Sequence, residues 1–411
     1  MTVLSLTGSG RPSSPSGRPP SVERVLGIVR LAIFASSLFV RAVDPVTPQI
    51  ANDLSVDIAS AAMLSTAFAL PYALVQPVLG AMADMLGKTR LITFCLLILV
   101  VAALLGALAT SFSMLLASRI ISGIVAGGVF PISLAMAGDL VPVHQRQVAI
   151  GRLLAAAMLG NVLGSPGAGF VADLIGWRGI FAVAGGLAAI VLVAAVIGFR
   201  GVTAAEKMTF SLASLPTHYR TIFTNPMAKI CYGAVFVEGI FLFGLFPYVA
   251  PLLHDAGEPR AAVAGGIIAG FGAGGLIYSV TVSLMLARLG EKRLMLAGGA
   301  LMGLTLMAFA IPAAWPFKLV EFAVIGFAFY MLHGVIQIYA TELAPSARGS
   351  SMALHSAFFF FGQAIGPVVY RFGLAHAGLT PTLVVAGFMI IGVGVVCSLF
   401  LRRAPVSGRG R

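Results

Sequence analysis

Four ionisable side chains lie inside long apolar stretches of this 411-residue sequence, at Arg41, Asp44, Arg119 and Glu238. Charges are unfavourable in hydrocarbon, so groups of this kind usually mark a substrate pathway, an ion pathway or a proton relay. Carboxylates can carry protons, whereas guanidinium groups act as fixed positive charges. The chemistry that these residues suggest is proton transfer and ion pairing inside a membrane.

Glu238 has no Lys or Arg on its own apolar stretch until Lys229 at the edge. A desolvated carboxylate without a cation can exchange protons near neutral pH. His333 lies at a comparable depth in another stretch. We hypothesise that Glu238 couples the protein to protons, with His333 as its candidate partner. The alternative for both residues is a structural hydrogen bond between helices.

Arg41 and Asp44 are three residues apart, which places them on one face of a helix. Arg119 is expected at a similar depth. We predict that these three residues form one charge cluster in a central cavity, with Asp44 as a fixed counter-ion. The alternative for Arg41 and Asp44 is a gate or folding pair.

Three further residues are candidates for substrate binding. Tyr330 and Gln337 are spaced along the same helical face as His333, and Phe241 follows Glu238 by three positions. Aromatic residues at helical spacing more often serve packing or face lipid, so packing is the alternative for Phe241 and for the run at 358–361.

These residues must be positioned by membrane-spanning helices. The chain is 59% hydrophobic and only 10% charged, which leaves too little polar surface for a soluble globule of this length. A helical span needs enough apolar residues to cross about 30 Å of hydrocarbon. Twelve runs satisfy this, at about 26–49, 59–82, 91–110, 113–136, 147–171, 178–199, 229–252, 262–287, 294–314, 318–340, 349–372 and 379–401.

The halves of the sequence repeat each other at an offset of about 203 residues. The pattern Asp139-Leu140-x-Pro142 with Arg146 returns as Glu342-Leu343-x-Pro345 with Arg348, and Gly160-x-x-x-Gly164 returns as Gly362-x-x-x-Gly366. Repeated halves in a hydrophobic chain are typical of secondary transporters. We therefore predict an all-α membrane protein whose twelve transmembrane helices form two pseudo-symmetric six-helix bundles.

The domain boundaries follow from these runs. We predict a disordered cytoplasmic tail at 1–24, an N-terminal bundle at 25–200, a cytoplasmic linker at 201–228, a C-terminal bundle at 229–401 and a cytoplasmic tail at 402–411. One set of alternate loops holds only Arg178, Arg260, Lys318 and Arg371, and most other Lys and Arg residues fall on the opposite side. Both termini are thus predicted to be cytoplasmic, with the chain in a cell membrane, such as a bacterial inner membrane.

The segment Gly80-x-x-x-Asp84-x-x-Gly87-Lys88-x-Arg90 resembles the loop signature of the major facilitator superfamily. The resemblance implies that Asp84 lies near the start of the span at 349–372 and helps to latch the cytoplasmic gate. The second half has Ala287 where the aspartate belongs, so only the first half is expected to carry this latch.

Other segments resemble the twelve-span drug:proton antiporters of this superfamily. They are Pro45-x-x-Pro48, Arg119-x-x-Ser122-Gly123, and the run Gly160, Gly164, Pro166 and Gly169 in the span at 147–171. The span at 349–372 repeats this run as Gly362, Gly366 and Pro367, where the alternative is simple helix packing through small residues.

The resemblance implies a secondary active transporter that exports small organic molecules, such as drugs or metabolites, in exchange for protons by alternating access. The alternative is a proton-coupled importer of a sugar, nucleoside or organic metabolite on the same fold. The sequence has no phosphate-binding loop, nucleophile constellation or metal-ligand spacing, so we expect no enzyme activity, cofactor or metal. The expected partners are substrate, protons and lipid, without nucleic acid, and the expected state is a monomer.

Overall fold

The computed structural model describes residues 22–201, 215–344 and 348–401. Within these ranges the regular elements are all helices. The first half consists of α1 (Val22–Leu38), η1 (Asp44–Val46), α2 (Thr47–Asp53), α3 (Ile58–Leu86), α4 (Lys88–Ala107), α5 (Phe112–Leu140), α6 (Val143–Ile175) and α7 (Trp177–Gly198).

The second half begins with the short helix α8 (Leu215–Thr224), which lies within the predicted linker. It continues with α9 (Pro226–Phe241), η3 (Phe243–Leu245), α10 (Phe246–Asp255), α11 (Ala261–Ala308), α12 (Trp315–Glu342), α13 (Arg348–His376) and α14 (Leu379–Phe400). Helix α1 begins at Val22 and α9 at Pro226, each three residues before the bundle start predicted from the sequence. The predicted disorder of the two tails concerns residues outside the described ranges.

Ten of the described helical segments are long and apolar enough to cross a membrane. The prediction of twelve spans is consistent with this number, because two of the predicted spans do not appear as separate long helices. The first span is divided into α1, η1 and α2, and α11 contains two spans that meet at Gly290. Gly290 has φ 68°, a backbone conformation that residues with a side chain rarely adopt, and it makes the corner between them.

The first span of each half is broken at a corresponding place. In the first half the α-helix stops at Leu38 and resumes after the 3-10 turn Asp44–Val46, and in the second half α9 and α10 are separated by the turn Phe243–Leu245. Prolines follow both breaks, at Pro45 and Pro247, where they remove a backbone N–H donor and prevent a continuous helix. The two breaks extend the repeat seen in the sequence.

The repeated glycines make equivalent helix contacts in the two halves. A Cβ atom added to Gly164 of α6 would lie 2.7 Å from the Leu38 carbonyl oxygen of α1. A Cβ atom added to Gly366 of α13 would lie 2.7 Å from both the Ile240 carbonyl oxygen and the Gly244 Cα atom. Gly160 and Gly362 make similar backbone contacts one turn away, with Phe34 and Phe236. Only glycine allows these helices to approach so closely.

We expect Gly366→Ala to destabilise the protein by about 1–3 kcal/mol, because the added methyl group forces α13 away from the turn after α9. The measurement is the midpoint of thermal unfolding in detergent. Gly392→Ala in α14 is the matched control, since no atom lies within 4 Å of the added Cβ. Equal midpoints for the two variants would contradict the packing argument.

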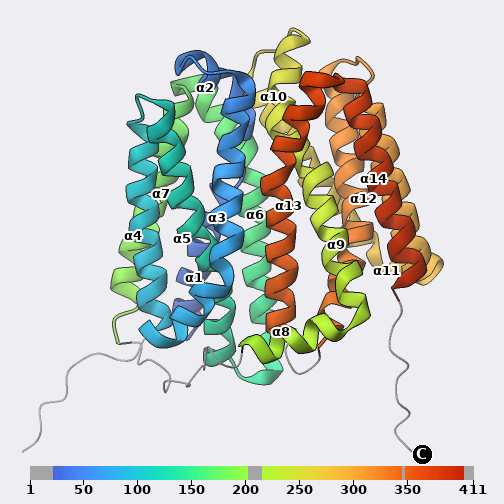
Figure 1. Cartoon of the computed structure of the whole chain (residues 1–411). Helices are drawn as coiled ribbons and strands as arrows, with labels where there is room; N and C mark the ends of the chain where they lie inside the picture. The colour runs from blue at the N-terminus through green and yellow to red at the C-terminus, as the bar shows by residue number, and fades with distance from the viewer. Residues whose placement is uncertain (1–21, 202–214, 345–347, 402–411) are drawn as a thin grey trace, which may run out of the picture.

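Each half has its own apolar core. One cluster of buried residues runs from Val25 to Phe199 and includes Ala261 from the other half. The second cluster runs from Ile222 to Leu401 and includes Ala62. In Figure 1 the first-half helices lie on one side and the second-half helices on the other, with α8 at one end of the bundles and α2 and α10 at the opposite end.

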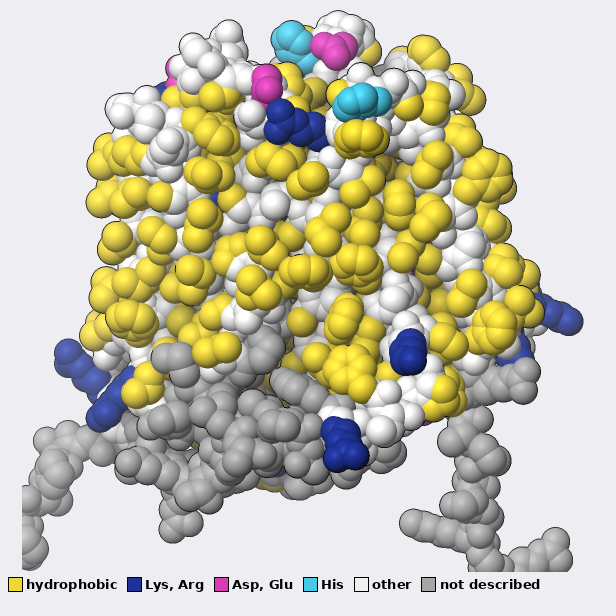
Figure 2. Space-filling model, in the orientation of Figure 1, with side chains coloured by type: hydrophobic (Ala, Val, Ile, Leu, Met, Phe, Trp, Pro, Cys, Tyr) yellow, Lys and Arg dark blue, Asp and Glu magenta, His cyan; other side chains and the backbone are white. Residues whose placement is uncertain are grey.

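The surface supports burial of the middle of the protein in a membrane. Hydrophobic side chains cover the middle of the face shown in Figure 2. Lys and Arg side chains gather mainly toward the end at which Figure 1 shows α8, and the visible Asp, Glu and His side chains gather at the other end. Such a charge-poor belt is the surface that lipid tails require.

Candidate functional site

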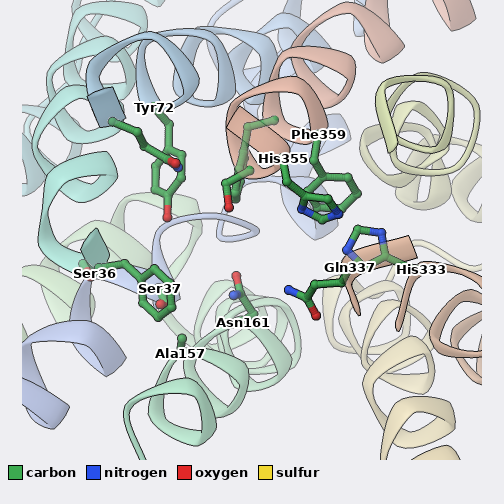
Figure 3. A pocket seen from close by; sticks show the side chains of 13 residues that line it. Ser36, Ser37, Tyr72, Ala157, Asn161, His333, Gln337, His355 and Phe359 are labelled. Atoms are coloured by element: carbon green, nitrogen blue, oxygen red, sulfur yellow. The ribbon is translucent and has the colours of Figure 1, made fainter. Parts of the chain in front are cut away.

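A cavity of about 210 Å³ lies between the two halves. Both halves supply its walls, and the labelled side chains in Figure 3 point toward one shared space. The first half contributes Ser36 and Ser37 of α1, Tyr72 and Gln76 of α3, Phe130 of α5, and Ala157 and Asn161 of α6. The second half contributes His333 and Gln337 of α12, and His355, Ser356, Phe359 and Phe360 of α13.

Glu238 and His333 form a hydrogen-bonded pair beside this cavity. The His333 Nδ1 atom lies 2.8 Å from Oε2 of Glu238, and the Glu238 side chain is fully buried. Its Oε1 atom has no hydrogen-bond partner among the described residues. The pair can share one hydrogen in either direction, with imidazole donating to carboxylate or carboxylic acid donating to imidazole. Such a pair can therefore keep its hydrogen bond through a change of protonation.

The local sequence explains how Glu238 reaches this position. The next residue, Gly239, lets α13 approach α9 so closely that an added Cβ would lie 2.8 Å from the Gly362 Cα atom. The His333 ring stacks on Phe329 at a centroid distance of 4.5 Å. Phe359 packs at 4.9 Å from the same ring. These contacts fix His333 between the buried carboxyl group and the cavity.

His355 adds a second imidazole to the site. Its ring lies 5.0 Å from the ring of His333, and its Nε2 atom is buried without a hydrogen-bond partner among the described residues. Sequence reasoning missed His355, along with Gln76 and Asn161. The available signal was the presence of uncharged polar residues inside apolar spans, whereas the sequence search concentrated on formal charges.

The structure brings Arg41, Asp44 and Arg119 together, as the sequence predicted. Arg41 Nη1 lies 3.4 Å from Asp44 Oδ2, and the Ser65 hydroxyl donates to Asp44 Oδ1 at 2.5 Å. Arg119 donates to the carbonyl oxygens of Phe39 (2.8 Å) and Leu64 (3.3 Å). The Phe39 carbonyl oxygen has no partner within a helix, because α1 ends at Leu38 and the first span is broken there.

The position of this cluster differs from the one predicted. None of the three residues lines the cavity, and all three are buried in the protein. The reason is that hydrogen bonds and rings already occupy most of the space around the guanidinium groups: Arg119 lies over Phe68 at 4.4 Å, and Arg41 lies over Phe243 at 4.7 Å and Phe246 at 4.6 Å. Arg119 Nη2 is buried without a hydrogen-bond partner among the described residues. This arrangement is that of a network within the protein and not of an open ligand site.

Arg41 also joins the two halves, because its Nη2 donates to the Gln363 side-chain oxygen of α13 at 2.5 Å. Two other contacts join the halves at the α2 and α10 end. The Asp173 carboxylate of α6 accepts from the backbone N–H groups of Ala261 and Ala262, at 3.0 and 2.9 Å. We call these three contacts, with the ion pair described next, the seal.

The fourth contact of the seal is an ion pair between Asp57, just before α3, and Arg371 of α13. Arg371 Nη2 lies 3.7 Å from Asp57 Oδ2. The side chain and the backbone N–H of Ser60 both hydrogen-bond to Asp57 and lower its pKa. The carboxylate therefore remains charged opposite Arg371, although an exposed pair of this kind contributes little stability.

Of the other residues predicted to bind substrate, some line the cavity and some do not. Gln337 lines the cavity, and so do Phe359 and Phe360 of the aromatic run. Tyr330 instead packs among aromatic rings, 6.1 Å from Phe271 and 6.4 Å from Tyr278, and Phe241 is not part of the cavity wall. Phe241 packs against the apolar core of the second half, in line with the packing alternative raised for it. No such alternative was raised for Tyr330.

Part of the predicted gate loop can be placed. Gly87 has φ 88° and forms the tight turn between α3 and α4, where a residue with a side chain would be strained. Lys88 pairs with Asp139 at 2.5 Å, and Arg90 is exposed. The surroundings of Gly80 and the side chain of Asp84 lie outside what the structure describes, so the predicted latch stays a prediction.

The pseudo-symmetric helices and the cavity between them agree with a family comparison. A family model described as Major Facilitator Superfamily matches residues 30–280 and 231–411. The chain belongs to this superfamily. The chain is similar to the MFS-type transporter YfhI of Bacillus subtilis (strain 168), with 23% identity over 397 residues, 93% of this chain and 94% of the relative. It is also similar to the quinolone resistance protein NorA of Staphylococcus aureus, with 25% identity over 358 residues, 85% and 89% of the two chains.

Solved structures of other transporters are similar in fold to this chain. A crystal structure of a D-xylose-proton symporter superposes with a TM-score of 0.71 at 15% identity, covering 92% of this chain and 97% of the other. An inward-facing, unoccupied bacterial homologue of the lysosomal transporter Spinster gives a TM-score of 0.65 at 18% identity, covering 93% and 96%. The protein is a multi-pass membrane transporter, and its helices are consistent with the twelve-span fold predicted from the sequence.

Proposed function

We propose that the protein exports small organic molecules in exchange for protons, by alternating access between its two halves. The observation that carries this proposal is the Glu238–His333 pair at 2.8 Å, because His333 also lines the cavity between the halves. Among the described residues, His333 joins the cavity wall to Glu238 by a hydrogen bond, so a substrate that contacts His333 changes the surroundings of the carboxyl group. Proton binding and substrate binding can then oppose each other at one site.

The transport cycle follows from the seal and the cavity. With the seal intact the α2 and α10 end is held shut by contacts between the halves, and rocking of the halves must break these contacts to open that end. The excess of Lys and Arg toward the α8 end supports placing that end, and both termini, in the cytoplasm. The conformation described here then has its external side closed, and protonation of Glu238 biases the halves between the two states.

Export is favoured over import by the similarity to a relative named for quinolone resistance. The second candidate, proton-coupled import, is favoured by the similarity in fold to a D-xylose-proton symporter. Energised inverted membrane vesicles distinguish them, with dyes, antibiotics, sugars and nucleosides added in turn. An exporter releases protons from the vesicles when its substrate is added outside. A lack of response to the whole panel, with uptake of one of these compounds by intact cells, would contradict export.

We expect Asp173→Ala to open the external side more often. Loss of a helix N-terminal carboxylate costs about 0.5–2 kcal/mol, and one or two kcal/mol shifts an equilibrium by about 5–30-fold. The measurement is labelling of a Ser37→Cys probe by a membrane-impermeant thiol reagent added from outside, in a chain whose native cysteines are replaced.

Asp53→Ala is the matched control for this variant. Asp53 lies at the same end of the protein, but its partners Arg178 and Trp177 belong to its own half. Labelling should rise in the Asp173 variant and remain at the starting level in the Asp53 variant. Equal labelling in both variants would argue against a seal at Asp173.

A further inference from the structure

The cavity wall carries many polar groups that the protein leaves unused. Six lining residues have side chains without a hydrogen-bond partner among the described residues: Ser37, Tyr72, Gln76, Asn161, Gln337 and Ser356. Tyr72 and Gln76 are buried, Ser37 and Ser356 are half-buried, and Asn161 and Gln337 are exposed residues of the cavity wall, so their polar groups are free to meet a ligand. In Figure 3 Asn161 of the first half and Gln337 of the second both point into the cavity. Both amides can donate and accept, so together they suit a ligand that does the same.

Formal charges are absent from the described part of this wall. The described lining residues include no Asp, Glu, Lys or Arg. Glu238 is fully buried behind His333, and the buried cluster of Arg41, Asp44 and Arg119 does not reach the cavity. A charged ligand would lose its hydration here without gaining a counter-ion, which is strongly unfavourable. The cavity therefore discriminates against organic cations and anions alike.

Aromatic rings form the remaining part of the wall. The ring centroids of Tyr72 and Phe360, from opposite halves, lie 4.2 Å apart, and Phe359 precedes Phe360 on α13. Such rings bury the apolar face of a flat or ring-shaped ligand. The volume of about 210 Å³ is below the roughly 300–1,000 Å³ of pockets for drug-sized ligands.

We infer that this cavity selects a small, uncharged molecule that carries several hydroxyl or amide groups around a ring, as a monosaccharide or a nucleoside does. Asn161 and Gln337 determine the specificity, because they bind the polar edge of the ligand from opposite halves. The aromatic residues Tyr72, Phe359 and Phe360 cover its apolar face. This inference rests on the proposed function, since it takes the cavity to be the transport site.

The test is equilibrium binding to the full-length protein in lipid nanodiscs, measured by calorimetry. The neutral probes are D-glucose, D-ribose, uridine and adenosine, and the charged probes, of similar or smaller size, are D-gluconate and 1-methylpyridinium. We expect saturable binding of at least one neutral probe and none of the charged probes. Binding of a sugar but not of a nucleoside, or the reverse, shows which of the two kinds of ligand the cavity takes. Binding of a charged probe alone, or of no probe at all, would overturn the inference.

Variants link the binding to the cavity. Gln337→Leu and Asn161→Leu should each lower the binding affinity for the neutral probe about tenfold, which is the effect of one lost hydrogen bond. Gln49→Leu on α2 is the matched control and should bind normally, because Gln49 is not part of the cavity wall. Gln337→Glu retains a polar side chain of similar size and should gain affinity for the small cation 1-methylpyridinium, which gives an increase in binding as the signal. Unchanged affinities in all three cavity variants would place the ligand elsewhere and overturn the inference.

The outcome is separable from that of the proposed function. If a neutral probe binds but is transported without proton movement, proton coupling is contradicted and the proposed substrate class is supported. If 1-methylpyridinium triggers proton movement in vesicles while no neutral probe binds, the coupling is supported and the substrate class is overturned.

Discussion

Replacing Glu238 by Gln is expected to abolish uphill transport driven by a proton gradient, reducing it to the level of empty liposomes. Gln retains the size of the side chain and can still hydrogen-bond to His333, but it cannot bind and release a proton. Exchange of labelled for unlabelled substrate needs no proton transfer, so it should continue. Both rates are measured with the purified protein in liposomes, with and without an imposed pH gradient.

The control for this prediction is Glu258→Gln, which removes a carboxylate from the exposed loop before α11. Glu258 pairs with Arg260 at the surface, and such a pair contributes little. This variant should transport at the wild-type rate with the same pH dependence. If Glu238→Gln also retained uphill transport with unchanged pH dependence, Glu238 would be a structural residue, the alternative already raised for it by the sequence.

The variant Asp44→Asn should lower the free energy of unfolding by about 3–5 kcal/mol, because it leaves buried cationic groups without their negative partner. Arg41 pairs directly with Asp44, and Arg119 belongs to the same buried cluster. Asn has nearly the same shape and can still bond to the hydroxyl of Ser65, so the change tests the charge alone. The measurement is denaturant unfolding in detergent, followed by intrinsic fluorescence.

Asp53→Asn provides a matched control, since it makes the same chemical change in an ion pair with Arg178 at the surface. The free energy of unfolding of this control variant is expected to fall by only about 0–1 kcal/mol. The comparison also bears on the predicted role of the cluster. A large loss of stability supports the folding interpretation of Asp44. A stable Asp44→Asn protein that fails only in transport would instead favour a direct part in the transport cycle.

Sequence reasoning predicted the helical membrane fold because span length and composition depend on the bilayer and hardly on tertiary contacts. It also predicted the Glu238–His333 partnership, since an intramembrane carboxylate requires a polar partner at similar depth. The glycine repeats at Gly160 and Gly362 were visible in the sequence. What they contact, the first helix of each half, became apparent only in three dimensions.

Other features depended on tertiary structure. The break after Leu38 exposes the Phe39 carbonyl, and Arg119 occupies that acceptor, so its depth in the membrane alone did not identify its surroundings. The corner at Gly290 is a backbone feature that hydropathy does not detect. The unpaired amides of the cavity were overlooked because a neutral side chain in an apolar span becomes informative only when its neighbours are known.

The central claim is that substrate and proton move in opposite directions through one site that contains Glu238 and His333. It is tested most directly by following both species at once, with a pH-sensitive dye inside liposomes that hold the purified transporter and a labelled substrate outside. Substrate entering down its gradient should drive protons out in the wild type and drive none in Glu238→Gln. Proton entry together with substrate, or substrate movement without any proton signal in the wild type, would contradict the account.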